Sequence, residues 1–221
     1  EKSAFLRAPT KTLTIPGINP RAADLIQEDR PVPFEIYERM LAGLDGEPKF
    51  RLFTKLDVNP VSGRTKQRKL GSPNQAMVTL HRRFFSYLRS GPFYSKRERC
   101  LTYSSASRRG DRTLKNVLPH RANRFFYLLD FHNAFGNVLP KRLAEVLSWL
   151  DKRLAGKEQE AEAFLARYFF TPGRGLVQGG NAAPDLFNLY TGALVDVRLA
   201  EILYAYNITY TRYTYDLTFS S

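Results

Sequence analysis

Sulfur and imidazole side chains are scarce in this sequence. Its 221 residues include one cysteine, Cys100, and three histidines, His81, His120 and His132. A single cysteine forms neither an intrachain disulfide nor a cysteine-based zinc site, and this usage favours a reducing, intracellular compartment. The histidines are too far apart along the chain to suggest a histidine metal cluster. The composition therefore excludes a disulfide scaffold and a cysteine-based zinc module.

Long hydrophobic runs are also missing. No apolar run approaches the length of about 20 residues that a membrane-spanning helix needs, and no secretory signal is visible. The sequence has no internal repeat and no low-complexity segment. It begins at Glu1 instead of methionine and stops at Ser221, directly after a strand-like run. We therefore expect a segment of a longer cytoplasmic protein without membrane contact.

Acidic residues are fewer than basic ones. The sequence contains 34 lysines and arginines but only 21 aspartates and glutamates, which gives a net charge of +13 and a pI near 10.0. This balance favours a polyanionic partner, with nucleic acid as the first candidate, although a basic but otherwise ordinary protein remains an alternative. Because 43% of the residues are hydrophobic and 13% are aromatic, the chain can build a proper core.

The stretch 124–138 is the most informative part of the chain. An apolar and aromatic run leads directly into Asp130, and Phe135 follows five positions later. This pattern is typical of a fully buried strand whose end delivers a carboxylate to a site. We expect a cation or hydrogen-bond donors next to that acid, because burying it alone costs free energy. The alternative is a polar residue that ends the strand and caps a turn.

Residues 50–70 alternate in the manner of a β-hairpin with a cationic return strand. Lys55 and Arg68 are expected to lie across from each other. An ammonium and a guanidinium bind phosphate oxygens with charge-assisted hydrogen bonds, so this pair predicts a triphosphate clamp. A solvated basic edge that discourages strand pairing is the alternative interpretation.

Helical periodicity and helix-start residues predict most of the remaining elements. The expected helices cover residues 19–29, 33–42, 73–91, 113–123, 140–156, a segment around 164–169, and 184–203. We interpret His81 as a core or boundary histidine rather than a ligand. The basic stretch 95–112 is expected to be a loop along a nucleic-acid backbone.

Two further stretches complete the set of motifs. A glycine-rich turn over 173–184 precedes the last helix, and glycine lets a backbone come close to a ligand. Within it, Gln178 offers both a donor and an acceptor to a base or a sugar. The chain closes with a predicted hairpin over 208–220 that carries Asp216 at or beside its tip.

The order of these features resembles the reverse transcriptase family, in particular its bacterial retron-type branch, over residues 50–221. Asp130 and Phe135 resemble the first palm motif. The segment 175–184 resembles the second, G-x-x-Q-G-x-x-x-S-P, with Ala183 in place of the serine.

Further signatures agree with this resemblance. Asn116 and His120 keep the ends of an N-A-x-x-H signature, with Val117 in place of the alanine. Lys55, Arg68 and Pro73 stand where the family has its fingers lysine, arginine and proline.

The last hairpin departs from the family. Residues 213–220 resemble the segment Y-A-D-D-L-T-F-S, but Tyr215 stands where the first, metal-binding aspartate belongs, and Asp216 keeps the second. A neutral phenol is a poor magnesium ligand and is longer than a carboxylate. On a strand, adjacent side chains point to opposite faces, so we expect Asp216 to replace the missing acid poorly.

The resemblance implies an α+β fold of the right-hand polymerase type, with an antiparallel palm sheet backed by helices. It divides the chain into an N-terminal arm with short helices (1–49), fingers (50–123) and palm (124–221). A fingers part is interleaved around 140–175, and a thumb is absent from this chain.

The resemblance also implies roles for particular residues. Asp130, the Phe131 carbonyl and Asp216 would hold Mg²⁺ or Mn²⁺ in two-metal nucleotidyl transfer. Phe135 would exclude a 2′-hydroxyl and favour deoxynucleotides. Lys55 and Arg68 would bind the phosphates of the nucleotide. Gln178 and Gly179 would lie beside the incoming nucleotide and the template.

The expected function is that of a bacterial, cytoplasmic RNA-directed DNA polymerase domain, impaired by Tyr215. Its partners would be an RNA template, a DNA or RNA primer and deoxynucleoside triphosphates; protein partners are not indicated. One alternative is a catalytically silent pseudo-polymerase that binds RNA or an RNA–DNA hybrid as a scaffold, for example in antiviral defence. A general basic single-strand binder is the third.

Overall fold

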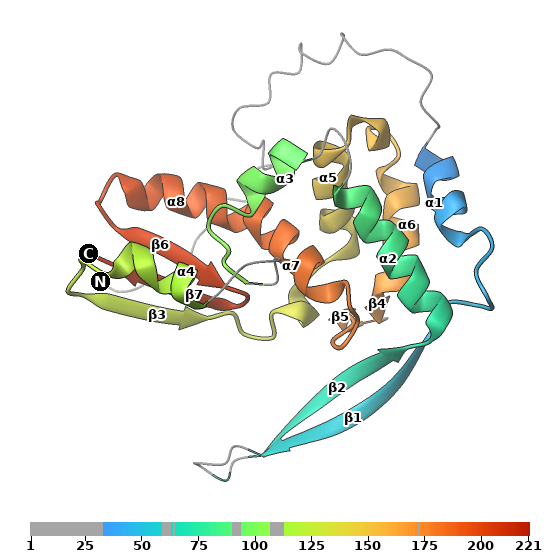
Figure 1. The fold of residues 1–221 in the computed structure, drawn as a ribbon, viewed down its shortest axis with the longest axis horizontal. Coiled ribbons are helices and arrows are strands. Elements are labelled where there is room, and N and C mark those ends of the chain that lie inside the picture. The colour runs from blue at the N-terminus through green and yellow to red at the C-terminus, as the bar shows by residue number, and fades with distance from the viewer. Residues whose placement is uncertain (1–32, 59–62, 64, 90–93, 107–112, 172) are drawn as a thin grey trace. The chain divides into compact units, whose positions relative to one another are not determined.

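The computed structural model describes residues 33–58, 63, 65–89, 94–106, 113–171 and 173–221. The predicted arm, the predicted helix 19–29 and part of the hairpin loop lie outside these residues. The chain divides between residues 30 and 31, so both the 50–123 and the 124–221 segments belong to the second part. That part is α+β, with antiparallel sheets and helices (Figure 1). None of the described helices is long and apolar enough to cross a membrane.

The predicted basic hairpin is confirmed. Strand β1 (Phe50–Val58) pairs antiparallel with β2 (Thr65–Pro73), and the register sets Lys55 opposite Arg68. Pro73 was expected to open the next helix, but it is the last residue of β2, and α2 begins at Gln75. The Asn74 side chain accepts a hydrogen bond from the Met77 N–H at 2.9 Å. A side-chain acceptor of this kind satisfies an N–H in the first turn of a helix.

A second sheet carries the predicted acids. Its strand order is β3 (Phe126–Asp130), β7 (Asp216–Ser220) and β6 (Thr209–Tyr213), all antiparallel. Figure 1 shows these three strands side by side, with α8 (Val197–Tyr204) next to β6. The predicted closing hairpin is therefore present, and it pairs directly with the strand that ends in Asp130.

The burial predicted for β3 is wrong. Every residue of this strand is exposed, and Leu128 is 70% accessible. A fully buried strand is covered on both faces of its sheet, but β3 is an edge strand that pairs only with β7 among the described residues. The buried sheet residues Tyr210 and Leu217 belong to the other two strands. Asp130 is exposed as well, so it needs no partner to offset a cost of burial.

The main core lies between helices. The helices around it share apolar faces that meet in one cluster containing Leu80, Phe84 and Leu143, each with no accessible surface. The helices of this cluster are α1 (Pro33–Leu41), α2 (Gln75–Arg89), α5 (Pro140–Leu150), α6 (Glu158–Phe169) and α7 (Ala183–Thr191). The short strands β4 (Phe170–Thr171) and β5 (Gly175–Leu176) pair beside it. The periodicity of the sequence therefore identified these helices, although the ends of α2, α5, α6 and α7 differ from the expected bounds.

The helix expected over 184–203 has an internal π-turn. α7 passes into a π-helical segment, Gly192–Asp196, before α8. A Cβ atom at Gly192 would collide with the Cys100 carbonyl, so glycine at this position allows α3 (Tyr94–Cys100) to pack closely. The loop predicted over 95–112 is therefore wrong for residues 95–100, because burial of Cys100 fixes them as a helix.

Smaller elements connect these parts. They are α4 (Thr113–Val117) with a 3₁₀ turn at Leu118–His120, and 3₁₀ turns at Phe135–Asn137 and Lys152–Leu154. The 3₁₀ turn that contains Phe135 is labelled η5 below. α5 ends at Leu150, earlier than expected, because Asp151 leaves helical geometry and its side chain caps the Lys152–Leu154 turn by accepting from the Arg153 N–H at 3.0 Å.

The buried histidines predict a pH dependence of stability. His81, the expected core histidine, is 1% exposed, stacks on Phe169 at 4.5 Å and contacts the Tyr168 carbonyl at 3.1 Å through Nε2. Burial lowers the pKa of His81 from 6.5 to about 4, and burial also lowers the pKa of His120. The unfolded chain therefore binds protons that the folded chain does not.

The contribution of the neutral buried histidines to the free energy of unfolding is expected to be fully present above pH 6.5. It should decrease as the pH falls toward 4. His81 alone accounts for as much as about 3 kcal/mol of this loss. Urea unfolding at pH 7 and pH 5 measures it. His81→Phe should flatten the dependence, whereas His132→Gln, a change at an exposed histidine, should leave it intact. An unchanged slope in His81→Phe would contradict the assignment.

Candidate functional site

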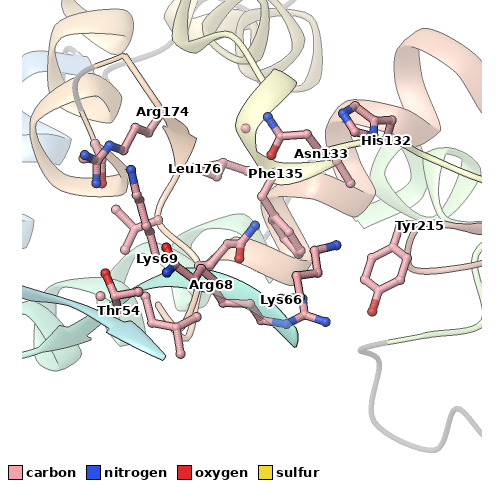
Figure 2. A pocket seen from close by; sticks show the side chains of 18 of the residues that line it. Thr54, Lys66, Arg68, Lys69, His132, Asn133, Phe135, Arg174, Leu176 and Tyr215 are labelled. Carbon is pink, nitrogen blue, oxygen red and sulfur yellow. The ribbon is translucent and has the colours of Figure 1, made fainter. Parts of the chain in front are cut away.

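A cavity of about 1040 Å³ lies between four segments of the chain. Its walls are the β1–β2 hairpin, the end of β3 with η5, the turn between β4 and β5, and the β6–β7 tip. Figure 2 shows side chains from these walls around one space, with Tyr215 from the β6–β7 tip and Lys66, Arg68 and Lys69 from β2. Segments that are distant in the sequence therefore meet at one site.

Two carboxylates stand next to each other at this cavity. The register pairs Asp130 at the end of β3 with Asp216 at the start of β7, and both line the cavity. The Phe131 N–H donates to the Tyr215 carbonyl at 3.0 Å, which continues the pairing one step further. Burial and the negative charge of Asp130 raise the pKa of Asp216. The predicted adjacency of the strand end and the hairpin tip is thus confirmed.

The orientation of Asp216 differs from the expectation. Strand alternation was expected to turn it away from the site, but cross-strand partners share one face of a sheet, so Asp216 is on the same face as Asp130. Tyr215 belongs to the two-residue turn before β7, not to a strand. Thr214, the other turn residue, has φ +56°. Alternation therefore does not separate Tyr215 from Asp216, and both line the cavity.

The acids fit one divalent cation better than two. In the described parts of the chain, no three His, Cys, Asp or Glu side chains come together, so Asp130 and Asp216 form a pair without a third acid. Magnesium takes oxygen ligands, and two ions need carboxylates to share between them. Tyr215 at this tip offers a phenol in place of a third carboxylate, and the residue is 37% exposed. A one-cation site is compatible with these residues, and a two-cation site lacks a third carboxylate among the residues that the structure describes.

The cationic wall differs in part from the predicted clamp. Arg68 lines the cavity, but Lys55, its cross-strand partner, is not among the lining residues. Asp57 forms ion pairs with both, and its hydrogen bond with Arg68 holds the pKa of the Asp57 carboxyl below its usual range. Lys66, which was not among the predicted site residues, also lines the cavity two residues before Arg68. The period of two along β2 was the signal that could have found it.

Phe135 forms part of the cavity floor. It belongs to η5, is half-buried, and packs against Phe187 with 5.2 Å between ring centroids. Gly175 supports it from the other side: its φ is +73°, and a Cβ atom there would collide with the Phe135 and Gly136 carbonyls. The glycine-rich turn therefore comes close to the first motif, as glycine allows, rather than to open space.

Gln178 and Gly179 have different environments. Gln178 lines the cavity, and its carbonyl accepts a 2.7 Å hydrogen bond from the Gly71 N–H of β2. Gly179 is not among the lining residues; its φ is +92°, and a Cβ atom there would lie 2.9 Å from the Gly71 carbonyl oxygen. This turn therefore attaches the hairpin to the rest of the site.

A buried ion pair fixes the β6–β7 tip. Arg212 and Asp196 have no accessible side-chain surface, and their closest contact is 2.7 Å. Arg212 also donates to Asn188 Oδ1 at 2.8 Å and to the Thr214 carbonyl, while the Tyr210 hydroxyl donates to Asp196 at 2.8 Å. The sequence reasoning missed this network, because a lone Arg in a strand pattern gives no sign of its partner.

Asn116 and His120 contact strands β6 and β7 of the same sheet. The two ring nitrogens of His120 contact the Ser220 and Thr211 hydroxyls, and the Thr211 hydroxyl donates to the Asn116 carbonyl at 3.2 Å. His120 is 2% exposed and does not line the cavity. The N-x-x-x-H signature therefore attaches α4 and its 3₁₀ turn to β6 and β7.

Comparisons with known proteins leave the family of this chain open. No protein-family model matches the sequence, and no curated protein shows a significant similarity to it.

Asp196→Asn is expected to lower the free energy of unfolding by about 3–5 kcal/mol, because it leaves the Arg212 charge buried without its counter-ion. Glu145→Gln is the matched control, since its ion pair with Arg142 is exposed on α5 and is worth at most about 1 kcal/mol. Urea unfolding measures both. Equal, small losses in the two variants would contradict the role assigned to the buried pair.

Gly175→Ala is expected to destabilise the protein more than Gly156→Ala. Both glycines have positive φ values, +73° and +76°, so alanine costs about 1–2 kcal/mol at either position. Only Gly175 faces a backbone collision, whereas nothing lies within 4 Å of a Cβ atom at Gly156. The collision adds about 1–3 kcal/mol. Thermal unfolding of the two variants measures the two losses of stability. Equal losses would contradict the backbone contact assigned to Gly175.

Proposed function

We propose that this chain is the fingers and palm portion of an RNA-directed DNA polymerase. The observation that carries the proposal is the cross-strand pair Asp130 and Asp216, which opens into the same cavity as the cationic strand β2. Nucleotidyl transfer needs this combination, because acids hold a cation while basic side chains bind the phosphates of the nucleotide.

Different residues of the chain would bind the cation and the triphosphate. Asp130 and Asp216, with the Phe131 carbonyl as a further oxygen, would hold a divalent cation, Mg²⁺ or Mn²⁺, which supplies charge neutralisation for phosphate oxygens. Arg68 and Lys66 bind the triphosphate. The Arg68 Nε–H donates to the Asp57 carboxylate, which restrains the guanidinium. No acceptor in the described residues contacts the two terminal nitrogens of Arg68, so these remain available for phosphate.

The base and the sugar meet other walls of the cavity. Phe135 lies on the cavity floor and excludes a 2′-hydroxyl, which selects deoxynucleotides. Gln178 contacts the nucleotide or the templating base with its amide. The RNA template and a DNA or RNA primer bind through the net charge of +13, which favours polyanions at any sequence. The retron-type resemblance suggests a bacterial cytoplasmic enzyme with a role in antiviral defence.

A silent pseudo-polymerase is the second candidate, and Tyr215 favours it. The phenol occupies the tip position that faces the cavity and supplies no carboxylate for a second cation. A protein of this kind binds RNA or an RNA–DNA hybrid as a scaffold without extending a primer. The two candidates share the nucleic-acid surface and differ in chemistry.

Primer extension on an RNA template with Mg²⁺ tests the proposal. Tyr215→Asp is expected to raise the extension rate by about a hundredfold or more, because a cation ligand contributes several kcal/mol at the transition state. Asp130→Asn should abolish extension in that background. Tyr206→Asp makes the same chemical change at an exposed position that does not line the cavity and should leave the rate unchanged.

The same assay separates the candidates. Extension that rises in Tyr215→Asp and depends on Asp130 supports the polymerase. Hybrid binding without extension in both the parent chain and Tyr215→Asp supports the scaffold. Extension that survives Asp130→Asn would contradict both accounts of the site.

A further inference from the structure

A second group of cations lines the cavity apart from Arg68 and Lys66. Lys69 of β2 and Arg174 of the turn between β4 and β5 both line it, and both are exposed. Figure 2 shows the amine end of Lys69 directed toward Arg174. Because Lys69 is one residue beyond Arg68 on a strand, the two side chains leave opposite faces of the hairpin. The cations therefore form two groups.

The backbone of Arg174 is held in place by its turn. The Arg174 N–H donates to the Thr171 carbonyl at 2.9 Å, and the flanking glycines, Gly173 and Gly175, have φ values of +69° and +73°. Leu176, the last residue of β5, is 2% exposed and anchors the turn in the core. The backbone of Arg174 is therefore held by a short hairpin with a buried end.

None of the described acids neutralises this pair. In the parts of the chain that the structure describes, no carboxylate lies within ion-pair distance of Lys69 or Arg174, whereas Arg68 has Asp57. Two cations that converge without a counter-ion repel each other and attract an anion. The geometry of the pair thus favours a phosphate, which accepts charge-assisted hydrogen bonds from both an ammonium and a guanidinium.

We propose that Lys69 and Arg174 form a second anion subsite, which binds the phosphodiester backbone of an unpaired nucleic-acid strand. This inference rests on the proposed function and adds the strand contact to it. The cavity of about 1040 Å³ is at the upper limit of single small-ligand pockets, so a nucleotide on Arg68 leaves space for a neighbouring strand. The triphosphate and the strand then occupy separate cationic groups.

The salt dependence of strand binding tests the subsite. Fluorescence anisotropy with a labelled oligouridine gives the slope of log K against log salt for the full chain and for Lys69→Ala/Arg174→Ala. Each phosphate contact on a single strand contributes about 0.7 to this slope, so the double variant should lose about 1.4. Lys141→Ala/Arg198→Ala removes the same charge from exposed positions that do not line the cavity and should leave the slope unchanged.

A second titration identifies the source of the phosphate. The affinity for a deoxynucleoside triphosphate should be the same in the full chain and in Lys69→Ala/Arg174→Ala. A variant that keeps the strand slope, or that loses nucleotide affinity instead, overturns the subsite while leaving the polymerase proposal in place. A full chain that binds no oligouridine at all contradicts the subsite and also the proposed nucleic-acid partner.

Discussion

The ion pair between Arg212 and Asp196 is the interaction on which the geometry of the candidate site depends. Both side chains are fully buried, and Arg212 reaches from β6 to Asn188 of α7 and to the Thr214 carbonyl in the β6–β7 turn. A buried charge pair of this kind gives little net stability but is costly to break, so it fixes one arrangement of the elements that it joins. It thereby positions the strand pair that carries both acids.

Glycine contacts extend this arrangement to the other walls of the cavity. The Gly71 N–H bonds to the Gln178 carbonyl, which attaches the cationic hairpin to the glycine-rich turn. Gly175 approaches the Phe135 carbonyl closely enough to exclude any side chain. These contacts depend on backbone proximity, and they explain why the glycine-rich turn, β2 and η5 surround one cavity. The cationic side chains of β2 and the acids are consequently held by one connected framework.

Local patterns predicted most of the elements, and tertiary context decided the rest. The β1–β2 hairpin and most of the described helices follow from periodicity and turn residues, whereas the position of Asp130 beside Asp216 was expected from the resemblance to the reverse transcriptase family. The exposure of β3 was missed because an apolar run does not reveal whether the strand lies at the edge of a sheet. The partners of Arg212 were also missed, because they come from other segments of the chain.

The central claim is that Asp130 and Asp216 act together on one divalent cation. Electron paramagnetic resonance can count the bound Mn²⁺ ions per chain in the presence of a non-hydrolysable deoxynucleoside triphosphate. Nucleotide brings its own phosphate oxygens, so the readout is the Mn²⁺ held in excess of a nucleotide-only control. The account predicts one such ion, lost in both Asp130→Asn and Asp216→Asn. Two ions per chain, or an unchanged count in either variant, would contradict it.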